Sequence, residues 1–485
     1  MSRTLILFDL TRLLSATGRA APTGIERVEY QYARWLSALG DVDVEFVATV
    51  ASAVRHVPKS SVLAFLDRQA RTWSDGAEGF SAQTAIDNVN AFLRGEHAPR
   101  PHKLAHLSPE ERRQRERGDG YEGSPFASWA RQMAAAWAHD KLEPVLRTAR
   151  GRRPIIYLRA SHDKLERPGP FDALKAQGVK IVIVAHDTIP IDFPEFVRPK
   201  AAHQCQERVT NMARLADGIV CVSHYCAGRL RPHLQPFNPR LVVAHPGTED
   251  VAIISAAPGM ADIPYFLMVS TIEARKNHTL VLNLWRRMIA ELGPKTPKLI
   301  IAGKRGWEAQ TPIAMLDRAA DLSPHVYEAG AAPDAAIKAL RQHATAVLMP
   351  SFVEGFGLPV TEALAEDTPV IASDIPAFRE IAGDACEFID PLDGPAWRTA
   401  IDAFAKPQSP RKHAAIGRAK RYNPPTWAAH FRHVRSLLDE IAAQSPALIR
   451  SHARRVLGSA ALMGRSGGQL ISTARPTGAR LDRNH

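Results

Sequence analysis

The chain has 485 residues, of which 45% are hydrophobic and 23% charged, a mixture typical of soluble globular proteins with two or three domains. No apolar run approaches the ~20 residues that a membrane span needs, which excludes an integral membrane protein. The net charge of +12 favours acidic partners such as phosphates, anionic membrane surfaces or nucleic acid. Half of this excess lies in residues 450–485, where seven Arg and one Asp give a net charge of +6.

The cysteines and the N-terminus indicate a cytosolic protein. The four cysteines are too few for a disulfide framework, and Cys221 and Cys226 lack the second pair that would complete a zinc site. We therefore expect reduced, structural thiols in a cytosolic compartment. The first apolar run, LILFDL, is interrupted by Asp9 and has no small-residue cleavage site, so it predicts a strand and not a signal peptide.

The first segments of the chain predict a β-α-β unit. Residues 4–10 form a compact apolar run typical of a buried strand, residues 22–39 carry apolar side chains at helical spacing, and residues 42–50 alternate like a strand. Gly24 lies at the strand-to-helix turn. It is either a simple turn glycine or a backbone donor that lines a cleft at the carboxyl edge of the sheet, where such folds bind ligands.

The alternation of predicted strands and helices weakens over residues 70–150, where many charged residues are mixed with Gly and Pro. We expect a helical or loop insertion there, and a solvated surface is favoured over a role in acceptor or partner selection. The alternation then resumes, and the strand at residues 180–185 ends in His186 and Asp187. Active-site residues gather at such strand ends, although a capping Asp beside an incidental His is the alternative.

The second half of the chain restarts the alternation. Helical segments separate the strand-forming segments 265–271, 298–307, 326–330, 344–350, 369–373 and 384–391. Regular alternation implies a parallel sheet with helices on both faces, so two doubly wound sheets with a ligand crevice between them are predicted. The predicted divisions are an N-terminal domain, a C-terminal domain and a basic tail, at 1–255, 256–444 and 445–485. The tail is expected to be flexible, with a short amphipathic helix on an anionic membrane as the alternative.

The stretch SFVEGFGLPVTEALA, residues 351–365, combines a glycine-rich loop with two glutamates. Gly355 and Gly357 place backbone N–H groups before a helix N-terminus, where an anion is favoured. Glu354 lies in the loop and Glu362 in the helix. N–H groups for a phosphate beside carboxylates for hydroxyls suit a nucleotide sugar.

Two basic pairs lie at strand ends of the same half. Arg275 and Lys276 suit a diphosphate, with Arg for forked hydrogen bonds and Lys as a point charge, and Lys304 and Arg305 could reach the same anion. A solvated basic face is the alternative for either pair. The chain has no G-x-x-x-x-G-K-[ST] loop, no G-x-G-x-x-G after the first strand and no Asp-x-Asp at a strand end. We therefore expect a site without metal or cofactor, in which cations and helix N–H groups neutralise the leaving group.

Several of these stretches resemble family 4 retaining glycosyltransferases with the GT-B fold. VSTIEARKNHTLVLNLW, LIIAGKRGWE and PSFVEGFGLPVTEALAEDTPVIASDIPAFREIAGDACEFIDP are similar to their C-terminal domain. DGPAWRTAI and PPTWAAHF, with FDLTRLL, PTGIERV, YLRASH and AHDTIPIDFPE upstream, resemble bacterial mannosyltransferases of surface-polysaccharide synthesis. The resemblance covers most of the chain except about 70–150 and the tail after 445. It implies an α/β fold of two Rossmann-like domains that face a central cleft.

The resemblance also implies residue roles. Glu354 would contact donor-sugar hydroxyls, Glu362 the ribose, and Arg275 with Lys276 the diphosphate, while His186 matches a histidine near the reacting carbon. The expected catalytic set is His186, Arg275, Lys276 and Glu354. The expected substrate-binding set is Gly24, Asp187, Gly303, Lys304, Arg305, Gly355, Phe356, Gly357, Leu358 and Glu362. The segment VVAHPGTED departs from the family by lacking the Asn of its Pro-Asn-Gly turn.

The implied activity is sugar transfer with retention of anomeric configuration, from a nucleotide sugar to a glycan or lipid-linked glycan. GDP-mannose is the first-choice donor, and the expected location is the cytoplasm, with peripheral contact at the inner face of the plasma membrane. The alternative is a non-catalytic GT-B scaffold that binds a nucleotide sugar or an anionic polymer. Nucleic-acid binding is not expected, because the charge excess is concentrated in the tail and no aromatic-basic platform is present.

Overall fold

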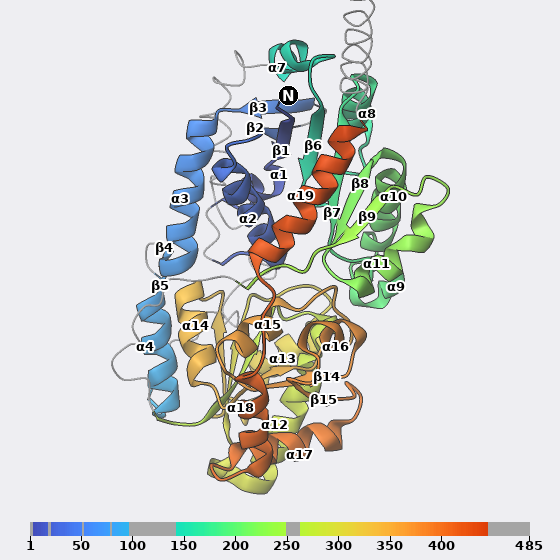
Figure 1. Ribbon diagram of the computed structural model, residues 1–485. Helices are drawn as coiled ribbons and strands as arrows, with labels where there is room; N and C mark the ends of the chain where they lie inside the picture. The colour runs from blue at the N-terminus through green and yellow to red at the C-terminus, as the bar shows by residue number, and fades with distance from the viewer. Residues whose placement is uncertain are drawn as a thin grey trace, which may run out of the picture.

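The chain folds into two α/β lobes, each built around its own sheet and placed one above the other in Figure 1. The computed structural model describes residues 3–17, 21–50, 53–77, 80–96, 142–248 and 262–444. The predicted tail and most of the predicted insertion lie outside these residues.

The first lobe holds a seven-stranded sheet of order β3-β2-β1-β6-β7-β8-β9. All neighbouring strands are parallel except β3, which pairs antiparallel with β2 at the edge. The strands are β1 (Leu5–Asp9), β2 (Asp43–Val50), β3 (Ala53–Val57), β6 (Ile155–Arg159), β7 (Lys180–Ala185), β8 (Gly218–Cys221) and β9 (Arg240–Val243). Every residue of β1 and β6 is buried, because helices cover both faces of the sheet.

The helices of the first lobe follow the predicted alternation. They are α1 (Thr11–Ser15), α2 (Gly24–Ala38), α7 (Leu142–Ala149), α8 (Gly169–Ala176), α9 (Ile189–Asp192), α10 (Ala201–Leu215) and α11 (His224–Leu230), with short 3₁₀ turns η2 (Pro194–Phe196) and η3 (Arg231–Leu234). Helix α2 begins at Gly24 because Thr23 and Glu26 form a reciprocal capping box.

The second lobe holds a six-stranded, fully parallel sheet of order β12-β11-β10-β13-β14-β15. Its strands are β10 (Tyr265–Val269), β11 (Lys298–Ala302), β12 (Val326–Gly330), β13 (Ala346–Met349), β14 (Val370–Ser373) and β15 (Glu387–Ile389). Its helices and turns are η4 (Ala274–Lys276), α12 (His278–Leu292), η5 (Gly293–Lys295), α13 (Gln310–Arg318), α14 (Asp334–His343), α15 (Leu358–Ala365), α16 (Pro376–Ala382), α17 (Gly394–Ala405) and α18 (Pro410–Ala419). The two doubly wound sheets predicted from the alternation are confirmed.

The strand orders define where ligands should bind. In each sheet the chain starts at a central strand, β1 or β10, builds to one side and then returns to the other. Such a reversal leaves a crevice at the carboxyl ends of the strands, between β1 and β6 in one lobe and between β10 and β13 in the other.

Helix α19 (Trp427–Ala443) follows the second lobe in sequence but packs over β6 to β9 of the first sheet (Figure 1). Its Phe431 ring stacks on Trp35 with a centroid distance of 4.4 Å, and a Cβ on Gly218 would lie 2.5 Å from Ile441. The domain limits stay a prediction, but this helix shows that the first lobe needs residues from both ends of the chain to cover its sheet.

Helices α3 (Lys59–Asp75) and α4 (Ala82–Leu93) form an arm that crosses from the first lobe to the second (Figure 1). They flank a short hairpin, β4 (Gly76–Ala77) with β5 (Phe80–Ser81), and pack on α14, while α4 also contacts β12. Phe92 stacks on Tyr327 at 5.2 Å, with the Lys298 ammonium 5.0 Å from its ring centroid. The insertion predicted over residues 70–150, with its solvated surface, stays a prediction, because the charged part of it lies outside the described residues. Within it, α4 buries its apolar residues against the second lobe.

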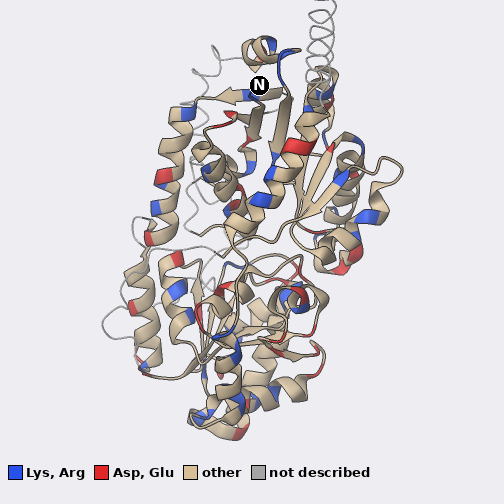
Figure 2. Ribbon diagram, viewed as in Figure 1, with Lys and Arg blue, Asp and Glu red and all other residues tan. Residues whose placement is uncertain are grey.

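Basic and acidic residues are interspersed over both lobes in the view of Figure 2. All four cysteines are buried and carry no disulfide. Among the helices that the structure describes, none combines the length and apolar character of a membrane span.

Candidate nucleotide-sugar site

A buried ionic cluster lies at the reversal point of the second sheet. Glu354 follows β13 and is held between two cations that follow β10: Arg275 Nη1 donates to Glu354 Oε2 at 2.5 Å, and Lys276 Nζ donates to Oε1. Ser351 Oγ also donates to Oε1, at 2.8 Å. Arg275 is paired a second time, with Glu273, at 2.7 Å. The predicted catalytic residues of this half are therefore brought together.

The cluster has a defined ionisation state. Burial would raise the pKa of Glu354, but Arg275 and Lys276 outweigh it and lower the pKa to about 2. Burial, followed by repulsion from Arg275, lowers the pKa of Lys276. Glu354 is therefore a carboxylate at neutral pH, which suits an acceptor of sugar hydroxyl hydrogen bonds and not a general acid.

Adjacent strand ends explain why residues almost 80 positions apart meet. Strands β10 and β13 are neighbours in the sheet, so the turn η4 and the loop before α15 leave the same edge side by side. The Phe352 N–H donates to the Arg275 carbonyl at 2.8 Å and ties the loop to the turn. Asn277 ends that turn in the left-handed conformation, with φ of 55°.

Two glycines let the loop fit its surroundings. A Cβ on Gly355 would lie 2.3 Å from the carbonyl oxygen of His186 and 3.0 Å from the Asp187 Cβ, both in the other lobe. Gly357 has φ of 119°, and a Cβ there would lie 2.6 Å from the Phe378 ring. Gly355 thus permits a close approach of the two lobes, whereas Gly357 permits Phe378 of α16 to pack against the loop within the second lobe.

The predicted residues of the first lobe face this loop. His186 Nε2 donates to the Ala160 carbonyl at 2.7 Å, since a carbonyl only accepts. Burial, followed by the nearby His162, lowers the pKa of His186 to about 4, so the ring is neutral at pH 7. Asp187 accepts from the Ile189 N–H at 3.1 Å. This is a turn contact, because the N-cap residue of α9 is Thr188 and makes no side-chain cap hydrogen bond. The capping and the functional interpretations of Asp187 therefore both stay predictions.

Gly24 and Leu358 meet from opposite lobes, because a Cβ on Gly24 would lie 3.4 Å from the Leu358 side chain. Gly24 is the first residue of α2 and Leu358 the first of α15, so two helix N-termini approach each other across the cleft. In the loop itself, the ring centroid of Phe356 lies 5.7 Å from that of His245 in the first lobe.

Glu362 belongs to a second ionic group, separate from Glu354. It accepts from Arg341 Nη1 at 2.8 Å, and Arg341 also binds Glu366. Asp334 lies nearby and pairs with Arg27 of the first lobe; burial raises the pKa of Asp334. Each predicted glutamate therefore has its own cation, which agrees with two hydroxyl-binding roles and not with an acid–base couple.

The second predicted basic pair, Lys304 and Arg305, lies outside the Glu354 cluster, and Arg305 has ionic partners of its own. The Arg305 guanidinium makes double hydrogen bonds to Glu328 and to Asp317, all between 2.7 and 3.0 Å. A diphosphate would have to compete with two carboxylates for Arg305, as it would for Arg275, which pairs with Glu273 and Glu354. The role of Lys304 and Arg305 in substrate binding stays a prediction. Gly303 is required by packing, because a Cβ there would lie 1.9 Å from the Ser270 carbonyl oxygen.

Sequence reasoning missed several residues that shape the site. Glu273 adjoins the predicted cations, and its place in EARKN was the signal that could have identified it. Phe196 and Phe352 stack across the cleft at 5.4 Å, and Ser223 Oγ donates to the Gly355 carbonyl at 2.6 Å. Glu380 of α16 reaches the first lobe, where it accepts from backbone N–H groups of α11. In each of these three contacts between the lobes, the two partners are more than 130 residues apart in sequence, so no local pattern reveals them.

Parts of the chain are similar in sequence to known glycosyltransferases. Residues 255–421 match the family described as Glycosyl transferases group 1. The chain is 30% identical over 229 residues to the serotype-specific mannosyltransferase WbdA of Escherichia coli, covering 44% of this chain and 28% of WbdA. It is 34% identical over 129 residues to O-antigen chain mannosyltransferase B of Escherichia coli, covering 27% and 33% of the two chains. The chain thus spans about a third or less of these relatives.

Among the solved structures that match, two resemble most of the chain in fold. One is Anabaena Alr3699/HepE in complex with UDP, with a TM-score of 0.52 and 14% identity over 90% of this chain and 100% of that one. The other is sucrose-phosphate synthase from Thermosynechococcus elongatus, with a TM-score of 0.54 and 13% identity over 91% and 100%. The predicted GT-B fold is confirmed.

Proposed function

Because residues 255–421 form a glycosyl transferases group 1 domain within a GT-B fold, we propose that the protein is a retaining glycosyltransferase of family 4. It moves a hexose from a nucleotide sugar to a glycan or lipid-linked glycan acceptor during surface-polysaccharide synthesis. Mannose from GDP-mannose is the first choice, since the relatives are named mannosyltransferases. Reduced, buried thiols favour action in the cytoplasm, and the basic tail suits peripheral contact with an anionic membrane.

The observation that carries this proposal is the buried Glu354 between Arg275 and Lys276, in a loop whose Gly355 lies against His186 of the first lobe. In our proposal Glu354 holds hydroxyls of the donor sugar. The two cations stabilise the negative charge that develops on the departing diphosphate, and their burial strengthens this effect. Because they supply the positive charge, the reaction is proposed to need no divalent metal.

In the proposed chemical step, the acceptor attacks the donor sugar from the same face as the leaving group. The acceptor oxygen attacks the anomeric carbon on the face from which the diphosphate leaves, and the acceptor proton passes to the departing phosphate oxygen. The enzyme contributes position and charge, without a covalent intermediate. Neutral His186, which donates through Nε2, keeps the Nδ1 lone pair available to orient a sugar hydroxyl.

A nucleotide panel followed by a turnover assay tests the proposal. Full-length protein is screened for thermal stabilisation by GDP, UDP and their sugars; a ligand at 100 times its Kd adds about 2.7 kcal/mol of stability. We expect stabilisation by GDP and sugar transfer in the presence of a chelator, with a product of retained configuration by NMR.

Variants connect that result to the site. Arg275→Ala should lower turnover by ~10²-fold or more, because it removes a charge contact to the leaving group. Arg286→Ala, at an exposed pair with Asp321, is the matched control and should leave turnover unchanged. Full activity of Arg275→Ala would refute the site. Tight nucleotide-sugar binding without product from any acceptor would favour the non-catalytic scaffold instead.

A further inference from the structure

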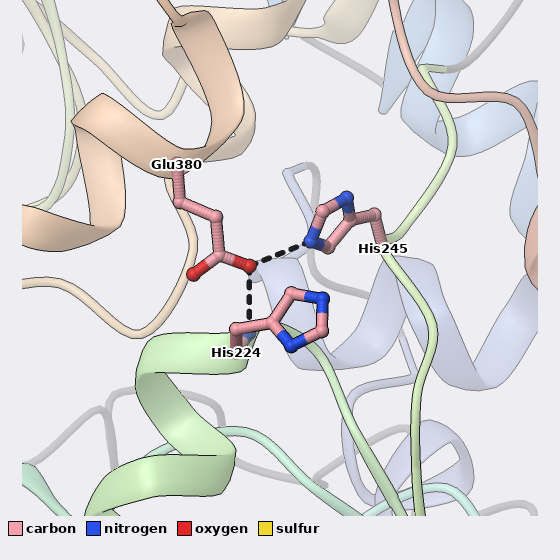
Figure 3. Close-up of side chains that lie close together, drawn as sticks. All are labelled: His224, His245 and Glu380. Atoms are coloured by element: carbon pink, nitrogen blue, oxygen red, sulfur yellow. Dashed lines mark hydrogen bonds and ion pairs between the residues drawn. The ribbon is translucent and has the colours of Figure 1, made fainter.

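A cluster of two histidines and one glutamate lies where the lobes meet (Figure 3). His224 begins α11 and His245 follows β9, both in the first lobe, while Glu380 projects from α16 of the second. One nitrogen of each imidazole and one carboxylate oxygen lie within 4.8 Å of one another. None of the three belongs to the Glu354 cluster.

We propose that His224, His245 and Glu380 bind one divalent transition-metal ion, and that Zn²⁺ is the ion they fit best. Two imidazoles and one carboxylate form a ligand set that zinc accepts, and three protein ligands leave a coordination position open for water. This proposal rests on observations separate from the proposed sugar transfer, so either can fail alone.

The geometry needs little rearrangement. His245 Nε2 and Glu380 Oε1 are 2.7 Å apart, joined by a hydrogen bond. In a tetrahedral site, ligand atoms about 2.0 to 2.2 Å from a zinc ion lie roughly 3.3 to 3.6 Å from each other. Replacing the proton of the hydrogen bond by the ion would therefore widen this gap by less than about 1 Å. The His224 side chain is exposed and can turn towards the ion without disturbing the core.

The surroundings hold the ligands in place, as they do in metal sites generally. The Glu380 carboxylate accepts from the backbone N–H groups of His224 and Tyr225, at 2.6 and 2.9 Å. The His245 carbonyl accepts from His430 Nδ1 at 3.2 Å, which fixes the backbone beneath the second ligand.

A pocket of about 660 Å³ adjoins the cluster and gives the open position access to solvent. His224 and His245 line it together with His430 and His433. An ion at the cluster would link two segments of the first lobe to α16 of the second. Since His245 also lies 5.7 Å from Phe356 of the glycine-rich loop, the ion would hold the lobes together close to that loop.

Metal binding to untagged, full-length protein tests the proposal. After treatment with a chelator and its removal, Zn²⁺ is titrated by calorimetry, and Co²⁺ is followed by its visible absorption. We expect one strong equivalent of either ion and an increase in thermal stability when Zn²⁺ is added. His224→Ala is the primary variant, because its exposed ring can be removed without unfolding the protein.

His224→Ala and Glu380→Gln should each weaken Zn²⁺ binding at least ~10-fold and change the Co²⁺ spectrum. Removing a residue that merely supports a ligand already weakens metal affinity about 10-fold or more, and removing a ligand should weaken it further. Glu380→Gln keeps one acceptor oxygen for the two α11 N–H groups, but its amide nitrogen cannot accept from the other. His203→Ala is the control, because His203 and Glu207 form an exposed pair at 3.5 Å outside the cluster. No saturable strong site, or a site unchanged by His224→Ala, would overturn the proposal.

Discussion

Replacing Glu354 by Gln tests the electrostatic reasoning at the candidate site. Gln keeps the size and one of the two acceptor oxygens but removes the charge, which leaves Arg275 and Lys276 buried with one carboxylate, Glu273. The pKa of Glu354 falls from an ordinary 4.5 to about 2 on folding. At 1.36 kcal/mol for each pKa unit, the ionised form stabilises the fold by about 3 kcal/mol at pH 7, which is comparable to the cost of breaking a buried ion pair.

The pH dependence has a definite sign. Because the pKa of Glu354 is lowered in the folded state, the unfolded chain binds more protons between the two pKa values. The stabilisation is therefore complete above about pH 4.5 and is lost as the pH falls towards 2. The stability difference between the wild type and Glu354→Gln should shrink over the same range.

Chemical denaturation followed by tryptophan fluorescence measures this difference, since Trp285 and Trp397 are fully buried in the second lobe. Asp321→Asn, which breaks an exposed pair with Arg286, is the control and should cost less than about 1 kcal/mol. A Glu354→Gln cost below 1 kcal/mol at pH 7, or a difference that grows on acidification, would refute the assignment of a charged, ion-paired Glu354.

Two further predictions concern contacts between the lobes. Gly355→Ala should destabilise the protein by about 1 to 3 kcal/mol and lower turnover, because the added Cβ would lie 2.3 Å from the His186 carbonyl oxygen. Gly228→Ala is the control and should stabilise the protein by about 0.5 to 1 kcal/mol, because Gly228 is helical and faces open space. Thermal unfolding that ranks the two variants in the other order would contradict this steric reasoning. Phe92→Ala should cost about 3 kcal/mol in denaturation, because the ring is 6% exposed between Tyr327 and Lys298. Phe237→Ala, at 54% exposure, should change stability by less than about 0.5 kcal/mol, and equal effects of the two variants would show that the arm does not join the lobes.

Much of the site was predictable because it depends on local patterns at strand ends. Arg275 and Glu354 each follow an apolar run, and parallel strands place their carboxyl ends on one edge, so their proximity follows once the sheet is recognised. The carboxylates that bind Arg305 were not predictable in the same way. Asp317 lies on a helix and Glu328 within a strand, and both patterns are equally consistent with solvent-facing charges.

The sequence by itself determined the fold class, since apolar runs of strand length separated by amphipathic helices have few other ways to bury their surface. It also determined the glycine-rich loop and the cations beside it. Only the tertiary structure decided that α19 returns to the first sheet, that α4 packs on the second lobe, and that His245 meets Glu380 from 135 residues away. The hydrophobic periodicity of a helix or strand shows which of its faces is apolar. Which element that face packs against depends on how the two lobes are placed relative to each other, and local sequence does not encode that placement.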